Sequence, residues 1–150
     1  MEELYKDLKA KHDLPDYGLM DKEFEISAIE DETFVLREIR KTMAEKIDAS
    51  LKFLDNLFHP DPGFANYREA ELFNDKDRED MVSIYRRLMF FKRGHSELTL
   101  EDSDTLNGRF INDFMAEWPN LKSKLLVYVK KMKESWQQDM TKKEVVGYLG

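Results

Sequence analysis

The fold is decided by residues 34–58, which read FVLREIRKTMAEKIDASLKFLDNLF. Large apolar side chains recur there every three or four residues, the spacing that places them on one face of an α-helix. The residues on that face are Leu36, Ile39, Met43, Ile47, Leu51, Leu54 and Phe58. At ~1.5 Å per residue the helix would be about 37 Å long. We therefore expect residues 34–58 to form the central helix of a small bundle, ending at the His59-Pro60 pair.

One charged residue, Arg40, falls inside this apolar face, close to Leu36 and Met43. Two interpretations follow: a buried arginine paired with a carboxylate, or a contact for an anion or phosphate. The first is favoured, because an unpaired buried charge costs a large amount of free energy.

Composition describes a globular protein. The chain has 150 residues, of which 41% are hydrophobic and 37% charged, and this length suits one domain. It has no cysteine, which excludes disulfides, thiolate metal sites and a cysteine nucleophile. The N-terminus lacks the apolar stretch of a signal peptide, and no run approaches the ~20 apolar residues of a membrane span. We therefore expect a cytoplasmic protein with no membrane contact.

The net charge of −7 is unevenly distributed along the chain. Residues 1–33 hold eleven acidic residues and four lysines, whereas the remaining residues carry equal numbers of acids and bases. Residues 120–143 hold seven lysines against Glu134 and Asp139. This polarity is typical of a protein that presents charged surfaces to a partner.

Three further helices are predicted after the central one. The first covers residues 74–93, with Asn74 as N-cap and Gly94 as the terminating residue. The second covers residues 105–118, and Pro119 opens the third, over 119–137. His95, directly after the first of these helices, is expected to interact with its negative C-terminal end. On the last helix, Trp136 is expected on the core face.

The other segments are predicted with less regular structure. Residues 2–12 suit a short helix, residues 59–73 a long loop, and residues 97–100 a brief strand. Residues 22–29 alternate apolar and polar side chains, which favours an extended arm, although a poor helix is left open. The predicted fold is all-α: a single-domain bundle of four to five helices, with residues 1–33 as an acidic N-terminal arm or short helix.

Templates for catalysis and metal binding fail. The acidic turn from Asp102 lacks the glycine and the final glutamate of an EF-hand, and the three histidines are far apart in sequence. The acids at 75–80 could hold Mg²⁺ only with carboxylates from a second element, which the sequence does not identify. We therefore predict no catalytic residue, no metal site and no cofactor.

Contact surfaces are indicated on two helices. Phe90 projects opposite the core face of its helix between Arg86 and Arg93, which suits a protein interface, a stacked base or packing within the fold. Apolar residues also lie off the core face of the last helix. They are Leu126 and Val127, which lie beside Lys122, Lys130 and Lys133. Apolar side chains on an outer face indicate burial by another segment or another chain.

These observations favour a non-enzymatic protein-interaction or scaffold protein that binds a protein partner or another copy of itself. One alternative is nucleic-acid association through the basic residues of helices 74–93 and 119–137. The other is a metal-dependent all-α hydrolase. An acidic start, a long charged helix and an acid-capped helix together resemble the helical domains of GINS-type replication scaffold subunits. That resemblance would imply a scaffold role, but the chain lacks the small β-domain usual in that family.

Overall fold

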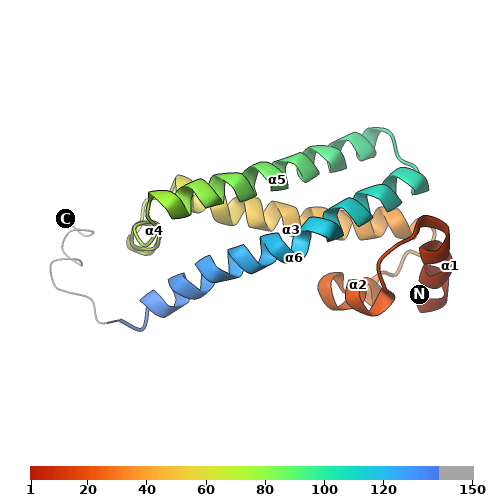
Figure 1. Ribbon diagram of the computed structural model, residues 1–150, viewed down its shortest axis with the longest axis horizontal. Coiled ribbons are helices and arrows are strands. Elements are labelled where there is room, and N and C mark those ends of the chain that lie inside the picture. Colours follow the sequence, from red (N-terminus) through yellow and green to blue (C-terminus); the bar gives the residue numbers. More distant parts are fainter. Residues whose placement is uncertain (139–150) are drawn as a thin grey trace. The chain divides into compact units, whose positions relative to one another are not determined.

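The computed structural model describes residues 1–138, and this part of the chain is all-α (Figure 1). It contains six α-helices and one short 3-10 helix, and no strand occurs among these residues. The α-helices are α1 (Glu2–His12), α2 (Tyr17–Phe24), α3 (Val35–Phe58), α4 (Phe64–Ala70), α5 (Asp75–Leu100) and α6 (Asp104–Ser135). The 3-10 helix covers Ile26–Ala28. The predicted all-α class is confirmed.

Helix α3 is the central helix that the sequence predicts, and it begins one residue later than expected. Its apolar face is buried as far as Leu54, whereas Phe58 is partly exposed and Leu57 takes the last buried position. The helix ends before His59 and Pro60, since the residue before a proline is disfavoured in helical geometry.

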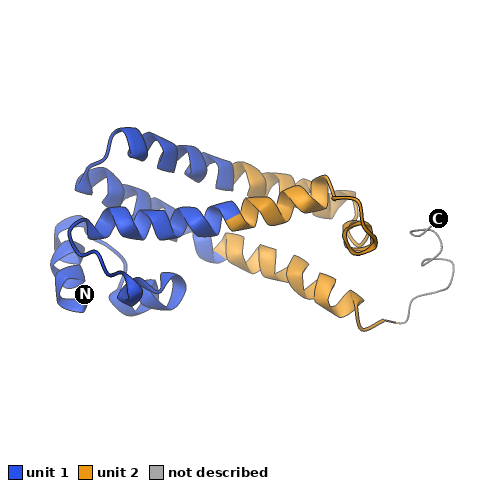
Figure 2. Ribbon diagram, turned by 180° about the vertical axis from the view of Figure 1, so that it is seen from behind, with its two compact units in different colours: residues 1–48, 88–119 blue, residues 49–87, 120–150 orange. Residues whose placement is uncertain are grey.

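The chain forms two compact units (Figure 2). Unit 1 consists of residues 1–48 and 88–119, and unit 2 consists of residues 49–87 and 120–150. Helices α3, α5 and α6 each contribute one part to each unit. Unit 1 has 20 acidic and 11 basic residues, a net charge of −9, whereas unit 2 has 11 acidic and 13 basic residues, a net charge of +2. The charge imbalance of the chain is therefore carried by unit 1.

The core of unit 1 is built around the ring of Phe114 on α6. This ring lies 5.2 Å from that of Phe91, 6.1 Å from that of Phe24 and 5.3 Å from that of Trp118, measured between centroids. These rings come from α2, α5 and α6, and all are buried. Aromatic contacts of this kind therefore join the N-terminal segment to the longer helices.

Unit 2 has its own apolar core. The rings of Phe73 and Tyr128 meet edge to face at 5.6 Å, and Ile84 and Leu125 are buried with them in this unit. Arg78 supports this core from its edge, because its guanidinium donates hydrogen bonds to the carbonyls of Leu57 and Ala70 at 3.2 and 2.6 Å.

The extended reading of residues 22–29 is wrong. Helix α2 continues to Phe24, Glu25 adopts a left-handed conformation with φ of 51°, and the 3-10 helix follows. The helical spacing of Met20 and Phe24 prevails over the alternation, because it buries both side chains on one face. Asp21 fixes the turn by accepting a hydrogen bond from the backbone N–H of Ser27 at 2.8 Å.

Helix boundaries differ from the prediction at three places. Residues 59–73 contain α4 rather than forming one long loop. Helix α5 passes Gly94 and continues to Leu100, so residues 97–100 are helical and not a strand. Pro119 lies inside α6 and does not divide it into two helices. A proline removes one backbone hydrogen bond from a helix, and burial of the flanking Trp118 and Leu121 favours continuation across it.

Trp136 lies just beyond the end of α6 and is 42% exposed, which corrects its predicted core position. Its indole N–H donates to a Glu69 carboxylate oxygen at 3.0 Å, and its ring lies 6.2 Å from that of Phe64. The residue therefore contacts the region of α4 at the protein surface.

Candidate protein-interaction site

The candidate site lies in unit 1, where α5 and α6 are joined by the short turn of residues 101–103. Two hydrogen bonds within the turn define its geometry. The Ser103 hydroxyl accepts from the backbone N–H of Leu106 at 3.2 Å, which caps α6. The Asp102 carboxylate accepts from the Asn107 side-chain amide at 2.7 Å. The turn is thus tied to the first residues of α6.

A buried arginine on α3 connects to both arms of this α5–α6 hairpin. Arg40 is 1% exposed, and its Nε donates to Asn107 Oδ1 at 2.8 Å. Its Nη1 lies 2.7 Å from His95 Nδ1 on α5, and its Nη2 lies 3.5 Å from Asp102 Oδ1. Arg37 also donates to Asp102, through Nε at 2.6 Å. Arg40 is therefore paired with a carboxylate inside the fold.

The electrostatics of this cluster follow from its hydrogen bonds and burial. The Asn107 hydrogen bond is the largest influence lowering the pKa of Asp102, and Arg37 and Arg40 lower it further. Burial lowers the pKa of His95, and the Arg40 charge acts in the same direction. Because a guanidinium only donates, His95 Nδ1 must be the acceptor, so the imidazole is neutral with its proton on Nε2.

His95 does not occupy the predicted position at a helix C-terminus, because α5 continues five residues beyond it. Its partner is the Arg40 guanidinium rather than the last carbonyls of a helix. The predicted position of His95 was wrong because Gly94 was expected to end the helix, whereas α5 continues through it.

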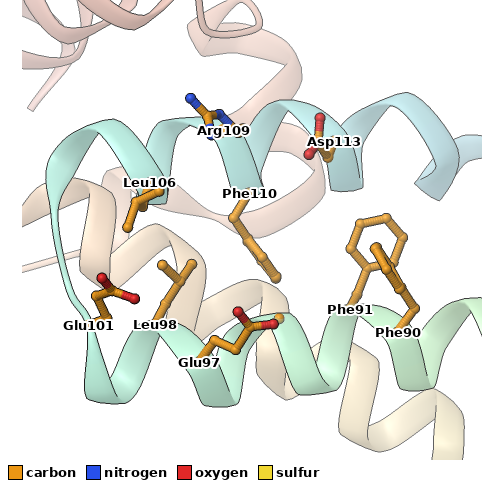
Figure 3. Close-up of a pocket in the computed structure, with 10 residues that line it drawn as sticks. Phe90, Phe91, Glu97, Leu98, Glu101, Leu106, Arg109, Phe110 and Asp113 are labelled. Atoms are coloured by element: carbon orange, nitrogen blue, oxygen red, sulfur yellow. The ribbon is translucent and has the colours of Figure 1, made fainter.

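A pocket of about 260 Å³ lies between α5 and α6 in this hairpin (Figure 3). Its apolar lining comes from both helices: Phe90, Phe91, Leu98, Leu106 and Phe110. The side chains of Leu98 and Phe110 point into the space between the two ribbons. The ring of Phe91 packs edge to face on that of Phe110 at 6.1 Å, so the inner wall is a continuation of the unit 1 core.

Charged side chains line the same pocket. They comprise three carboxylates, those of Glu97, Glu101 and Asp113, and one guanidinium, that of Arg109. All four residues are exposed. Glu97 and Glu101 lie on the α5 side, whereas Arg109 and Asp113 lie on α6 (Figure 3). The pocket therefore combines an apolar interior with a rim of net negative charge, and we call it the acidic-rimmed pocket.

Gly94 contributes to the size of the pocket. A Cβ atom at this position would lie 3.6 Å from the Phe110 ring, which is ordinary van der Waals contact. An alanine would therefore fit here without a clash, and its methyl group would occupy space that is open in the pocket. The glycine serves here as a small residue inside a helix and not as a helix end.

The predicted residues of α5 are separated by the boundary between the units. Arg86 belongs to unit 2, whereas Phe90 and Arg93 belong to unit 1, and all three are exposed. Phe90 is 61% exposed and lines the acidic-rimmed pocket. Glu97 was not predicted as a site residue, because a helix end was expected at Gly94. The repeat of positions 90, 94, 97 and 101 on one helical face was the signal that could have revealed it.

Three of the predicted residues of α6, Leu126, Lys130 and Lys133, are exposed on a second surface, in unit 2, whereas Lys122 is partly buried. Leu126 and Val129 are 43% and 44% exposed, and they lie about one turn apart on the flank of the buried face. Lysines precede and follow this apolar pair at helical spacing. We call the set the lysine stripe: Lys122, Leu126, Val129, Lys130 and Lys133. Val129 is the member that the sequence analysis did not include.

Among the acids of the first turns of α5, Asp77 interacts within the fold. Asp77 accepts a hydrogen bond from the backbone N–H of Asn74 at 3.1 Å and lies 3.9 Å from the Lys131 ammonium. Within residues 1–138, no three histidine or carboxylate side chains gather in a way that could hold a metal ion. The same residues include no helix with the length and hydropathy needed to cross a bilayer.

Comparisons with known proteins give no family for this chain. No family model matches it, and no match was found among curated proteins or solved structures. The resemblance to GINS-type subunits therefore gains no support from them. Function has to be inferred from the two surfaces themselves.

Proposed function

We propose that this protein functions by binding another protein, and that the acidic-rimmed pocket of unit 1 is its binding site. The observation that carries the proposal is Phe90, a large aromatic side chain that is 61% exposed at the edge of an apolar pocket. Exposed aromatic residues beside an apolar depression are characteristic of the energetic centres of protein interfaces.

The chemistry of the pocket defines the kind of partner. Its apolar interior can accept a leucine-sized or phenylalanine-sized side chain, whose full burial contributes roughly 1.5–3 kcal/mol. Its rim of Glu97, Glu101 and Asp113, in a unit with net charge −9, favours lysine or arginine on both sides of that anchor. An amphipathic helix with an apolar anchor and basic flanks meets both requirements, and helices often bind in grooves of this kind.

The test uses two synthetic helical peptides that share the same apolar residues but carry either lysine or glutamate flanks. We expect the lysine peptide to bind, measured by fluorescence anisotropy, and the glutamate peptide not to bind. Phe90→Ala should weaken binding by about fivefold or more, since loss of a central aromatic contact commonly costs above about 1 kcal/mol. The matched control is Leu100→Ala, because Leu100 is 91% exposed on the same helix and does not line the pocket.

Two results would refute this proposal. One is equal binding of the two peptides, since the acidic rim would then have no effect. The other is an equal effect of Phe90→Ala and Leu100→Ala, since the pocket would then not be the binding site.

Nucleic-acid association is the second candidate function, and the lysine stripe is the observation that favours it. Residues 120–138 hold five lysines and one acid, Glu134. Binding of a single-stranded oligonucleotide should then weaken steeply between low and moderate salt, because phosphate contacts release counterions. Oligonucleotide binding should also be lost in the double variant that carries Lys130→Glu and Lys133→Glu. Absent or salt-independent binding would remove this candidate.

A further inference from the structure

We infer that a second copy of this chain is a partner for the acidic-rimmed pocket, and that it binds through its lysine stripe. The inference rests on the proposed function of the pocket and adds the identity of one occupant. In the resulting contact, unit 1 of one copy meets α6 of the other copy.

The lysine stripe has the pattern that the pocket requires. Leu126 and Val129 supply an apolar pair in which each side chain is almost half exposed. Lys122 lies four residues before Leu126, and Lys130 and Lys133 each lie four residues after a member of the pair. In a helix these spacings place a positive charge next to the apolar pair at both ends. A partner helix with an apolar anchor and basic flanks is therefore present on the chain itself.

The stripe is held as a rigid helical surface by the core of unit 2. Leu121, Leu125 and Tyr128 are buried on the inner face of the same helical segment. The outer residues therefore need no folding step before they bind, which lowers the entropic cost of association. The neighbouring Lys131 lies 3.9 Å from Asp77 and is not part of the stripe.

Charge complementarity between copies supports the pairing. Unit 1 carries −9, whereas residues 120–138 of unit 2 carry five lysines and one glutamate. Apolar contact between Phe90 and the Leu126–Val129 pair would supply the attraction at the centre. Glu97, Glu101 and Asp113 would face lysines around it. Ion pairs at an exposed rim are screened by salt, so association should weaken as ionic strength rises.

The test reverses the charges on each surface in turn and then mixes the two variants. Association is measured by analytical ultracentrifugation at low salt over a wide concentration range. The pocket variant carries Glu97→Lys and Glu101→Lys, and the stripe variant carries Lys130→Glu and Lys133→Glu. All four positions are exposed, so folding should be retained, and circular dichroism checks it. We expect the wild type to associate and each variant alone to dissociate at least tenfold more readily. A mixture of the two variants should associate again, because each then offers the charge that the other has lost.

A charge-matched control separates a specific contact from a general effect of net charge. Glu3→Lys with Glu45→Lys makes the same change in net charge at two exposed positions of unit 1 that do not line the pocket. This variant should associate at least as well as the wild type.

The inference would be overturned if the wild type were monomeric at every concentration. It would also be overturned if both the pocket variant and the stripe variant, each on its own, still associated like the wild type. Failure of the mixed variants to associate would also overturn it. In each of these cases the proposed function stands if the lysine-flanked peptide still binds in a Phe90-dependent manner. Loss of peptide binding as well would refute both.

Discussion

Unit 1 and unit 2 each hold an arginine against their core, but the two arginines have different kinds of partner. In unit 1, Arg40 is buried and contacts Asp102, His95 and Asn107 side chains. In unit 2, Arg78 donates to the carbonyls of Leu57 and Ala70, near the C-terminal ends of α3 and α4. Carbonyl groups do not titrate, whereas carboxylates and imidazoles do. The stability of unit 1 should therefore depend on pH and charge more than that of unit 2.

This difference parallels the distribution of surface charge. Unit 1 places its acidic-rimmed pocket in the hairpin that Arg40 supports, so the same turn carries both the buried ion pair and part of the pocket lining. Glu101 of the pocket is adjacent in sequence to Asp102 of the ion pair. Disturbing the buried pair should thus affect binding as well as stability.

The largest effect is expected for Arg40→Met. Removing one partner of a buried ion pair costs about 3–5 kcal/mol, because the remaining polar groups lose their compensation. We expect the lower part of this range, since the Asp102 side chain is 25% exposed and retains Arg37. Arg78→Met should cost less, about 1.5–3 kcal/mol, as expected for hydrogen bonds from a charged group. Urea unfolding of both variants measures the difference, and an equal or larger loss in Arg78→Met would contradict the comparison.

The second effect concerns mild acid and the His95 imidazole. The pKa of His95 is lowered in the fold by burial, by the Arg40 charge and by the Lys41 charge, whereas the Asp48 charge acts to raise it. The unfolded chain therefore binds the proton first. The free energy of unfolding should be highest above the unfolded value of about 6.5 and should decrease as pH falls below it.

The control variant for this pH effect is His95→Gln, whose amide oxygen can accept from Arg40 but does not titrate. Thermal unfolding of the two proteins should diverge between about pH 6.5 and pH 5, where the unperturbed carboxyl groups are still mostly ionised. The wild type should lose more stability than the variant over that interval. Parallel pH curves would show that His95 is not the responsible group.

The sequence predicted the elements that depend on local pattern. Helix α3 has a single apolar face with a period near 3.6, so its position and most of its buried residues followed from spacing alone. The C-terminal end of α5 and the continuity of α6 across Pro119 did not follow. Gly94 and Pro119 have low intrinsic helix propensity, but tertiary packing on either side outweighs such preferences.

The candidate site was harder to predict because its parts are distant in sequence. Arg40 could be placed on the apolar face, but its partner Asn107 lies 67 residues further on. Phe90 could be recognised as an outward residue. Its position at the edge of a pocket depends on the return of α6 alongside α5 within unit 1, which no local pattern encodes. The lysine stripe was largely visible because all its members lie within one helix.

A third effect separates stability from binding within unit 1, through Gly94→Ala. A Cβ atom at this position meets the Phe110 ring at an ordinary 3.6 Å, so the variant should gain about 0.5–1 kcal/mol, as is usual for glycine to alanine in a helix interior. The added methyl group occupies pocket space, so affinity for the lysine-flanked peptide should fall at the same time.

Gly18→Ala is the matched control, because Gly18 lies in α2 of unit 1 and a Cβ there would have no neighbour within 4 Å. It should also favour folding, but it should leave peptide binding unchanged. Equal effects of the two variants on binding would show that position 94 does not contribute to the pocket.

The smallest effect is expected in unit 2, for the ion pair of Lys131 and Asp77. The two charged atoms are 3.9 Å apart, and the side chains are 49% and 30% exposed, so solvent screens most of their attraction. Lys131→Ala should therefore change the free energy of unfolding by less than about 0.5 kcal/mol, in contrast to Arg40→Met. It should also leave association between copies intact, because Lys131 lies outside the lysine stripe. A loss comparable to that of Arg40→Met would mean that exposed and buried ion pairs contribute alike in this protein, and the contrast between the units would then be wrong.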